Sequence, residues 1–334
     1  MNDEQNRFSH EVKLFFQSYL PNIKGLSPNT MLSYRDTLKF YFHFLSSAGH
    51  PIDKLDFCDF SRENVLQFLD FLEQKEKNSI STRNIRLAGI HAFFKYISFT
   101  CPEQLHLCQQ ILAIPFKKGG QREIEYFTYD EICSILEHID QSKWIGKRDF
   151  ALILFMFNTG ARAQEVVDLR VNNVNFEKPY LVSIMGKGRK QRTCPLWQKT
   201  VHAIKNYLED EKRFALPEHY LFVSASGASL TRFGLRYILK KRILLASSDN
   251  MSLKKKNLHP HSMRHSTGVY LLKAKNDLSS IANWLGHADI NTTTKYAKMD
   301  FSMKKNILKS LESPGIPEKR KWPSKNIVDW LESL

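Results

Sequence analysis

Residues 259–266 are His259-Pro260-His261-Ser262-Met263-Arg264-His265-Ser266, the densest group of reactive side chains in the sequence. His261 and Arg264 are three positions apart, so on a helix they share one face and can reach one ligand together. Arginine suits a phosphate because its planar guanidinium donates two parallel hydrogen bonds and keeps its charge. The stretch therefore predicts a helix with one face directed at a phosphate.

A tyrosine that could act as a nucleophile follows this stretch. Leu285-Gly286-His287 ends 23 residues after Arg264, and Tyr296 lies nine residues after His287. A tyrosine with an ordinary pKa of about 10 is almost wholly protonated at neutral pH, so it needs cationic neighbours and a base to attack a phosphate. Alone, Tyr296 would be interpreted as a packed aromatic residue and the histidines as cap or core residues. Their combination favours phosphodiester chemistry.

Two features upstream supply further cationic groups. An apolar helix predicted at about residues 147–158 is broken at Thr159-Gly160, and a second helix follows, which places Arg162 at the corner between them. Glu165 is interpreted as a structural partner of an arginine. Residues 180–196 predict a β-hairpin with Lys187 in its glycine-flanked turn. Other basic residues of this hairpin could bind a DNA backbone or replace Lys187 as the acid: Arg189, Lys190 and Arg192.

The composition describes a basic globular protein. Lys and Arg number 49 against 34 Asp and Glu, for a formal charge of +15, which makes nucleic acid the leading partner. The five cysteines are odd in number, spread out and never in a C-x-x-C pair, which favours reduced thiols over disulfides or a zinc site. The N-terminus has no apolar signal core, and no apolar run is long enough to cross a membrane. These features predict a cytoplasmic enzyme without a membrane partner.

Hydrophobic spacing divides the chain into two domains and a tail. Residues 1–114 predict a helical domain with four main helices, of which the second begins at Ser27-Pro28, the third after Ser61 and the fourth near Ser81. Polar residues 115–126 form the expected linker. A second domain, residues 127–312, begins with the capping box Thr128-x-x-Glu131 and includes a short strand predicted at residues 221–223. The tail is residues 313–334.

Five sequence elements together resemble the tyrosine recombinases, the phage integrase and Xer group. In order, they are Thr159-Gly160-Ala161-Arg162 with Glu165, Gly186-Lys187-Gly188, His261-x-x-Arg264-His265-Ser266, Leu285-Gly286-His287, and Tyr296. The resemblance implies a mainly α fold with a small antiparallel sheet. It also implies that a helical, SAM-like core-binding domain and the catalytic domain form a C-shaped clamp on DNA. Ala161 and Met263 depart from the residues usual in the family, but neither departure removes a reactive group.

The resemblance also implies a role for each candidate residue. Tyr296 would attack a DNA phosphorus, giving a 3'-phosphotyrosyl link and a free 5'-hydroxyl. Arg162 and Arg264 would hold the non-bridging oxygens, and Lys187 would protonate the leaving 5'-oxygen. His261 would exchange a proton with the nucleophile, and His287 would donate a hydrogen bond to the phosphate. No metal, cofactor or ATP is expected.

The same resemblance implies partners and a cellular setting. The expected substrate is double-stranded DNA with inverted-repeat core sites, bound by a homo-tetramer whose protomers exchange a C-terminal segment. A cytoplasmic, nucleoid-associated enzyme that integrates, excises or transposes a mobile element is favoured, in part by the extra tail. Two alternatives remain open: a DNA-binding relative that does not cut, and a type IB topoisomerase, which would relax DNA without strand exchange.

Overall fold

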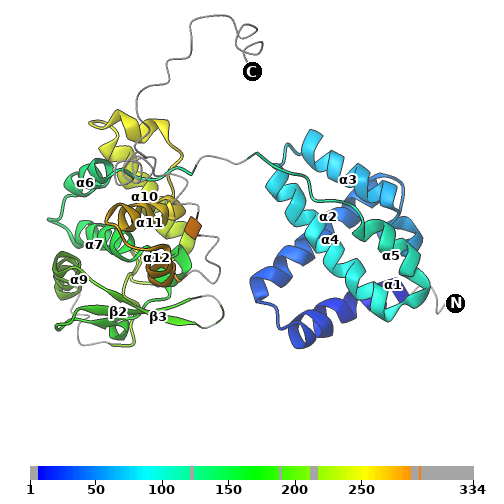
Figure 1. Ribbon diagram of the computed structural model, residues 1–334, viewed down its shortest axis with the longest axis horizontal. Coiled ribbons are helices and arrows are strands. Elements are labelled where there is room, and N and C mark those ends of the chain that lie inside the picture. Colours follow the sequence, from blue (N-terminus) through cyan, green and yellow to red (C-terminus); the bar gives the residue numbers. More distant parts are fainter. Residues whose placement is uncertain are drawn as a thin grey trace, which may run out of the picture. The chain divides into compact units, whose positions relative to one another are not determined.

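The computed structural model describes residues 7–120, 124–186, 188, 190–210, 217–286, 293 and 294. The chain divides into two compact units, Met1–Arg122 and Glu123–Leu334 (Figure 1). Within the described ranges, no helix combines the length and the apolar character that a bilayer span requires. The two units are described separately below.

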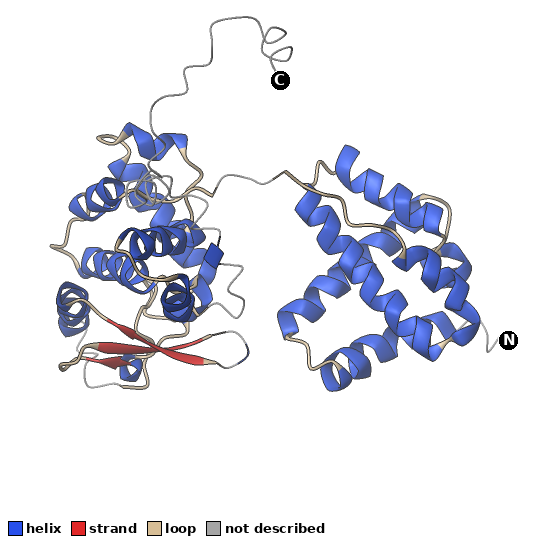
Figure 2. Ribbon diagram, in the orientation of Figure 1, coloured by secondary structure: helices blue, strands red, loops and turns tan. Residues whose placement is uncertain are grey.

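The described part of the first unit is built from helices (Figure 2). They are α1 (Arg7–Leu14), which continues into a π-helix (Phe15–Ile23), then α2 (Pro28–Ser47), α3 (Arg62–Gln74), α4 (Ile80–Thr100) and α5 (Leu105–Leu112). Ser27 and Ser61 cap α2 and α3 by accepting hydrogen bonds from the backbone amides of Thr30 and Asn64. The predicted starts of both helices are therefore confirmed, because a serine side chain can satisfy an amide that has no partner within the helix.

Aromatic packing forms the core of the first unit. Phe8 of α1 is 3% exposed and contacts four phenylalanine rings at centroid distances of 4.7 to 6.0 Å: Phe42, Phe57, Phe60 and Phe93. Full burial of one such side chain stabilises a fold by about 1.5–3 kcal/mol. These rings come from segments far apart in the sequence, so their packing joins α1 to other helices of the unit.

The second unit combines helices with one small sheet. Its helices are α6 (Tyr129–Glu137), α7 (Trp144–Thr159), α8 (Ala163–Val167), α9 (Gln198–Asp210), α10 (Arg232–Ala246), α11 (Pro260–Lys273) and α12 (Leu278–Leu285). The capping box at the start of α6 is confirmed, because the Glu131 amide donates to Thr128 Oγ1 and the Thr128 amide donates to Glu131 Oε2.

The sheet of the second unit contains the predicted hairpin. Strands β1 (Val174–Asn175), β2 (Leu181–Met185) and β3 (Gln191–Pro195) are antiparallel in that order, and Met185 pairs with Gln191 at the turn end. The short strand predicted at residues 221–223 is wrong, because only isolated bridges join Tyr220 to Arg170 and Val223 to Ser229. The apolar run that suggested a strand belongs to the core instead, where Leu221 and Phe222 are fully buried.

Helix α7 runs through the core of the second unit and brings the candidate site together. Its residues from Ala151 to Thr159 are all buried, and α9 and α11 pack against it (Figure 1). Thr267 of α11 donates a hydrogen bond to the Phe157 carbonyl at 2.7 Å. A Cβ on Gly160 would lie 2.4 Å from Leu285 Cδ2, so only a glycine lets α7 end this close to α12.

Candidate active site

Arg162 lies at the predicted corner between two helices. Helix α7 ends at Gly160, whose φ of 60° is the left-handed conformation that glycine adopts easily at a helix end. Arg162 is the N-cap residue of α8 and has an extended backbone. Its side chain is 33% exposed, so an anion in solvent can reach the guanidinium.

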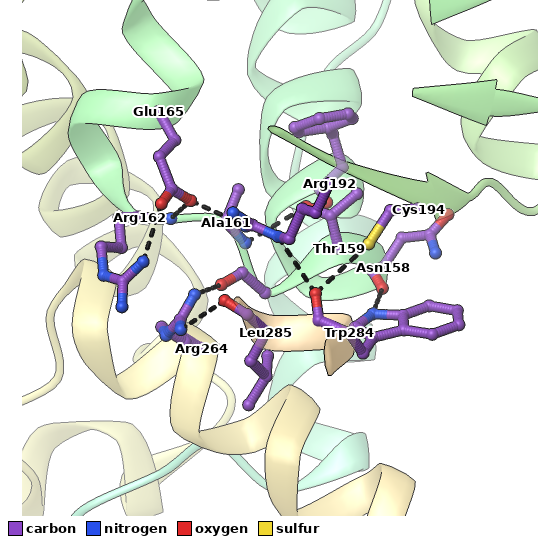
Figure 3. A network of polar contacts seen from close by, with 12 residues as sticks. Asn158, Thr159, Ala161, Arg162, Glu165, Arg192, Cys194, Arg264, Trp284 and Leu285 are labelled. Atoms are coloured by element: carbon purple, nitrogen blue, oxygen red, sulfur yellow. Dashed lines mark hydrogen bonds and ion pairs between the residues drawn. The ribbon is translucent and has the colours of Figure 1, made fainter. Parts of the chain in front are cut away.

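Glu165 is bound by two arginines, as its interpretation as a structural partner predicts. Its Oε1 accepts from Arg162 Nη1 at 2.8 Å, and its Oε2 accepts from the Arg162 amide at 2.9 Å and from Arg192 Nη2 at 2.7 Å (Figure 3). Burial alone would raise the pKa of Glu165. The hydrogen bonds and positive charges of Arg192 and Arg162 outweigh that effect, so the pKa lies below its ordinary value. The group at this corner is therefore a carboxylate shared between two guanidinium groups.

Arg264 projects from α11 and is 4% exposed. Its Nη1 donates to the Gly160 carbonyl at 2.8 Å, and its Nη2 donates to the Leu285 carbonyl at 2.6 Å (Figure 3). These two bonds orient the guanidinium between the end of α7 and the end of α12. A buried guanidinium is costly unless it is hydrogen-bonded, so the bonds to these two carbonyls help to stabilise it there.

His261 shares α11 with Arg264 and is exposed to solvent. The pKa of His261 is lowered, first because partial enclosure of the ring disfavours the imidazolium, and then because His259, Arg264 and Arg162 are close. A cavity of about 470 Å³ borders it, lined by Ala163, Arg232, Phe233, Arg236, His259, Pro260 and His261. The structure therefore brings His261 near both arginines, as the sequence predicts.

A second arginine, Arg192, holds the end of α12, and this contact was not predicted from the sequence. Arg192 Nε donates to the Trp284 carbonyl at 3.1 Å, and Cys194 Sγ donates to the same carbonyl at 3.5 Å (Figure 3). The helix then ends at Gly286, which has a φ of 66°. The sequence contained a signal for this arrangement. Successive strand residues alternate between faces, so the buried Cys194 implies an inward position for Arg192 two residues earlier.

Three of the six candidate residues lie outside the described part of the chain: Lys187, His287 and Tyr296. The described residues on either side of Lys187 close the hairpin, since the Gly186 amide donates to the Lys190 carbonyl at 2.8 Å. Within the described ranges, no cluster of three or more His, Cys, Asp or Glu residues is placed to hold a metal ion.

Comparisons with known proteins place both units in one family. Residues 125–303 match the phage integrase family, and residues 14–98 match the phage integrase N-terminal SAM-like domain. The chain is 33% identical over 324 residues to y4rC of Sinorhizobium fredii, a protein named for integrase or recombinase activity, with 97% of each chain covered. It is 30% identical over 282 residues to tyrosine recombinase XerD of Staphylococcus epidermidis, covering 84% of this chain and 90% of that protein.

Solved structures share the fold at lower identity. The XerH site-specific recombinase bound to difH substrate aligns over 93% of this chain and 90% of its own, with a TM-score of 0.66 and 20% identity. The Tn1549 transposon integrase in complex with transposon right end DNA aligns with a TM-score of 0.67 and 16% identity, covering 89% of this chain and 99% of that chain. The expected fold class, mainly helical with a small antiparallel sheet and a SAM-like N-terminal domain, is confirmed.

Proposed function

We propose a catalytic role for each candidate residue on the premise that this chain belongs to the phage integrase family and is a tyrosine recombinase, an enzyme that cleaves and rejoins DNA strands. The observation that carries the proposal is the proximity of Arg162, His261 and Arg264. Arg264 donates to the carbonyl of Gly160, two residues before Arg162. His261 borders the same cavity as Ala163, the residue after Arg162. Such a group suits a phosphate, whose charge the two arginines balance while the histidine moves a proton.

Arg162 and Arg264 form the proposed phosphate clamp. Arg264 is oriented by two backbone carbonyls, and Arg162 by Glu165. Donors fixed before DNA binds stabilise the charge that develops on the non-bridging oxygens without having to reorganise during the reaction. His287 would add a further hydrogen bond to the phosphate.

Tyr296 is the proposed nucleophile. Its phenolic oxygen attacks the phosphorus, the bond from phosphorus to the 5'-oxygen breaks, and the DNA 3'-phosphate becomes esterified to the tyrosine. The leaving 5'-oxygen takes a proton from Lys187. Rejoining is the reverse reaction with the 5'-hydroxyl of another strand. The phosphotyrosyl ester conserves the energy of the broken bond, so the reaction requires no ATP.

His261 is the proposed partner for the tyrosine proton. The pKa of His261 is lowered by partial enclosure and by nearby cations, so its neutral imidazole predominates at neutral pH. A neutral imidazole can accept the proton that Tyr296 releases on attack. Such general base catalysis typically contributes about 10²–10⁴-fold to a rate.

The biological setting of the reaction is also part of the proposal. We assign residues 1–114 to core binding, 115–126 to the linker and 127–312 to catalysis. Four copies would act on paired inverted-repeat core sites and exchange a C-terminal segment, and the tail, residues 313–334, would bind a neighbouring protomer or DNA. The substrate would be the ends of a mobile element, integrated, excised or transposed by a cytoplasmic, nucleoid-associated enzyme. Relatives named as integrases and as Xer recombinases support this range of roles.

The test uses labelled, nicked DNA from the native locus of the protein, with chelator present and without ATP. A nick next to the cleavage site traps the covalent product because the short 5'-hydroxyl strand diffuses away. We expect an SDS-resistant protein–DNA adduct that is absent in Tyr296→Phe. Tyr129→Phe is the matched control, because it removes a hydroxyl from a tyrosine of α6 that is 57% exposed.

The alternatives predict different outcomes of this experiment. If the wild-type protein binds the DNA tightly but forms no adduct, it is a DNA-binding relative that does not cut. If an adduct forms and supercoiled plasmid is relaxed, but two sites are never exchanged, the chain behaves as a type IB topoisomerase. Exchange between two sites together with the adduct is the result that recombination requires.

A further inference from the structure

Arg192 is placed where three parts of the candidate site meet. Its strand, β3, leads away from the hairpin turn that contains Lys187. Its guanidinium donates to Glu165, which holds Arg162, and to the carbonyl of Trp284 near the end of α12. A Cβ on Gly286 would lie 3.0 Å from Arg192 Cδ, so the chain leaves α12 directly against this side chain.

The burial of Arg192 separates it from a residue that binds DNA through its charge. Its side chain is only 10% exposed, and in the register of the hairpin it pairs with the buried Ile184. Lys190, two residues earlier on the same hairpin, is exposed. The Glu165 carboxylate already offsets part of the charge of Arg192, whereas an exposed lysine such as Lys190 can reach a DNA backbone.

The charge of Arg192 affects what Arg162 can do. Arg162, Glu165 and Arg192 together carry a net charge of +1, because two guanidinium groups share one carboxylate. Without Arg192 the remaining pair would be neutral, and Glu165, at 5% side-chain exposure, would be poorly screened by solvent. Glu165 would then compete with a DNA phosphate for Arg162 more strongly than it does in the intact group.

We propose that Arg192 is a positioning residue for strand cleavage. It keeps Arg162 available to the scissile phosphate by sharing Glu165, and it fixes the end of α12 from which the chain continues to His287. This inference rests on the proposed function, because it gives Arg192 a role in the reaction assigned to Arg162 and Tyr296. It replaces the interpretation of Arg192 as a DNA-backbone contact or as the acid.

The experiment measures adduct formation on nicked DNA under single-turnover conditions at saturating DNA, and separately DNA affinity as a function of salt. Arg192→Met is compared with Lys199→Met, which removes the same charge from an exposed side chain of α9 in the same unit. We expect Arg192→Met to bind DNA like the wild type and to cleave about 100-fold more slowly, the cost expected when a catalytic group is displaced by about 1 Å. Lys199→Met should cleave at the wild-type rate, because the candidate residues lie outside α9.

A double variant separates this role from simple loss of structure. Glu165→Gln combined with Arg192→Met restores a net charge of +1, because Arg162 is then the one charged member of the group. The neutral amide also competes less strongly with a DNA phosphate for Arg162. We expect the double variant to cleave about tenfold faster than Arg192→Met alone, which corresponds to a gain of about 1.4 kcal/mol in transition-state stabilisation. Loss of a purely structural bond would make the double variant as slow as the single one, or slower.

Several results would overturn the proposal. It fails if Arg192→Met cleaves at the wild-type rate. It also fails if the variant is defective only in DNA affinity and the slope of log binding constant against log salt concentration is smaller in magnitude by about 0.9, which indicates a lost phosphate contact. If Arg192→Met does not fold, Arg192→Lys decides, because lysine keeps the charge but lacks the two separate donor nitrogens with which Arg192 bonds Glu165 and Trp284. A rate at least about tenfold lower supports the proposal, and a wild-type rate rejects it. An inactive wild-type protein would instead reject the proposed function.

Discussion

Replacing Gly160 by alanine tests the closest packing in the site. Its φ of 60° costs an alanine about 1–2 kcal/mol. The new Cβ would also lie 2.4 Å from Leu285 Cδ2, well inside the usual contact distance of about 3.5–4.0 Å. Overpacking of this kind costs about 1–3 kcal/mol. We therefore expect Gly160→Ala to lower the free energy of unfolding by about 2–5 kcal/mol.

Gly188 provides the matched control for this substitution. Its φ is 73°, but a Cβ there would meet no atom of the described residues within 4 Å, so Gly188→Ala is expected to have only the backbone cost, about 1–2 kcal/mol. Urea unfolding followed by tryptophan fluorescence measures both variants. The five tryptophans all lie beyond residue 122, so the signal reports on the second unit: Trp144, Trp197, Trp284, Trp322 and Trp330.

A double-mutant cycle assigns the steric cost to Leu285. Leu285→Ala alone should cost about 2–5 kcal/mol, because the leucine is fully buried. In the double variant the close contact is gone, so the total cost should be smaller than the sum of the single costs by about 1 kcal/mol or more. If Gly160→Ala is no more destabilising than Gly188→Ala, or if the two effects simply add, α7 and α12 do not pack as closely as described.

Three further predictions concern the chemistry of single side chains. Arg264→Lys should slow adduct formation on nicked DNA at least about 100-fold, because one ammonium cannot reproduce the guanidinium bonds to two carbonyls. Because the pKa of His261 is lowered, the rate of adduct formation should decline at acidic pH with a midpoint below the ordinary histidine value of about 6.5, where the base becomes protonated. His261→Gln should remove that decline. Cys194 is buried and its pKa is raised to about 11, so iodoacetamide at mildly alkaline pH should modify the exposed Cys58 and leave Cys194 intact until urea is added, as judged by peptide mass spectrometry.

Local rules of helix chemistry account for the elements that the sequence predicted correctly. A serine or threonine that satisfies free amides marks a helix start regardless of the rest of the fold, as at Ser27, Ser61 and Thr128. The strand predicted at residues 221–223 failed because a short apolar run is compatible with any buried segment. There, the Leu221 amide donates to the Leu169 carbonyl and Arg148 Nη1 donates to the Val223 carbonyl, so these groups are satisfied with only isolated bridges.

The role of Arg192 could not be predicted from composition because a basic residue in a basic hairpin resembles a DNA contact. Its partners are Glu165, 27 residues earlier, and Trp284, 92 residues later. No local pattern connects positions so distant in sequence. Strand alternation alone could have placed its side chain on the same face as Cys194, toward the interior, and so have separated it from Lys190.

The two arginines at the end of α12 link the phosphate clamp to the chain that continues toward His287. Arg264 and Arg192 reach the consecutive carbonyls of Leu285 and Trp284 from different elements, α11 and β3. A helix C-terminus carries partial negative charge on its unpaired carbonyls, so cations there are favourable as well as geometrically specific. Because Arg264 holds the end of α12 with the same guanidinium that we assign to the phosphate, a shift of Gly286 would also change the orientation of the clamp. The end of α12 and the orientation of the phosphate clamp are therefore coupled directly through Arg264 and, by way of Glu165, through Arg192.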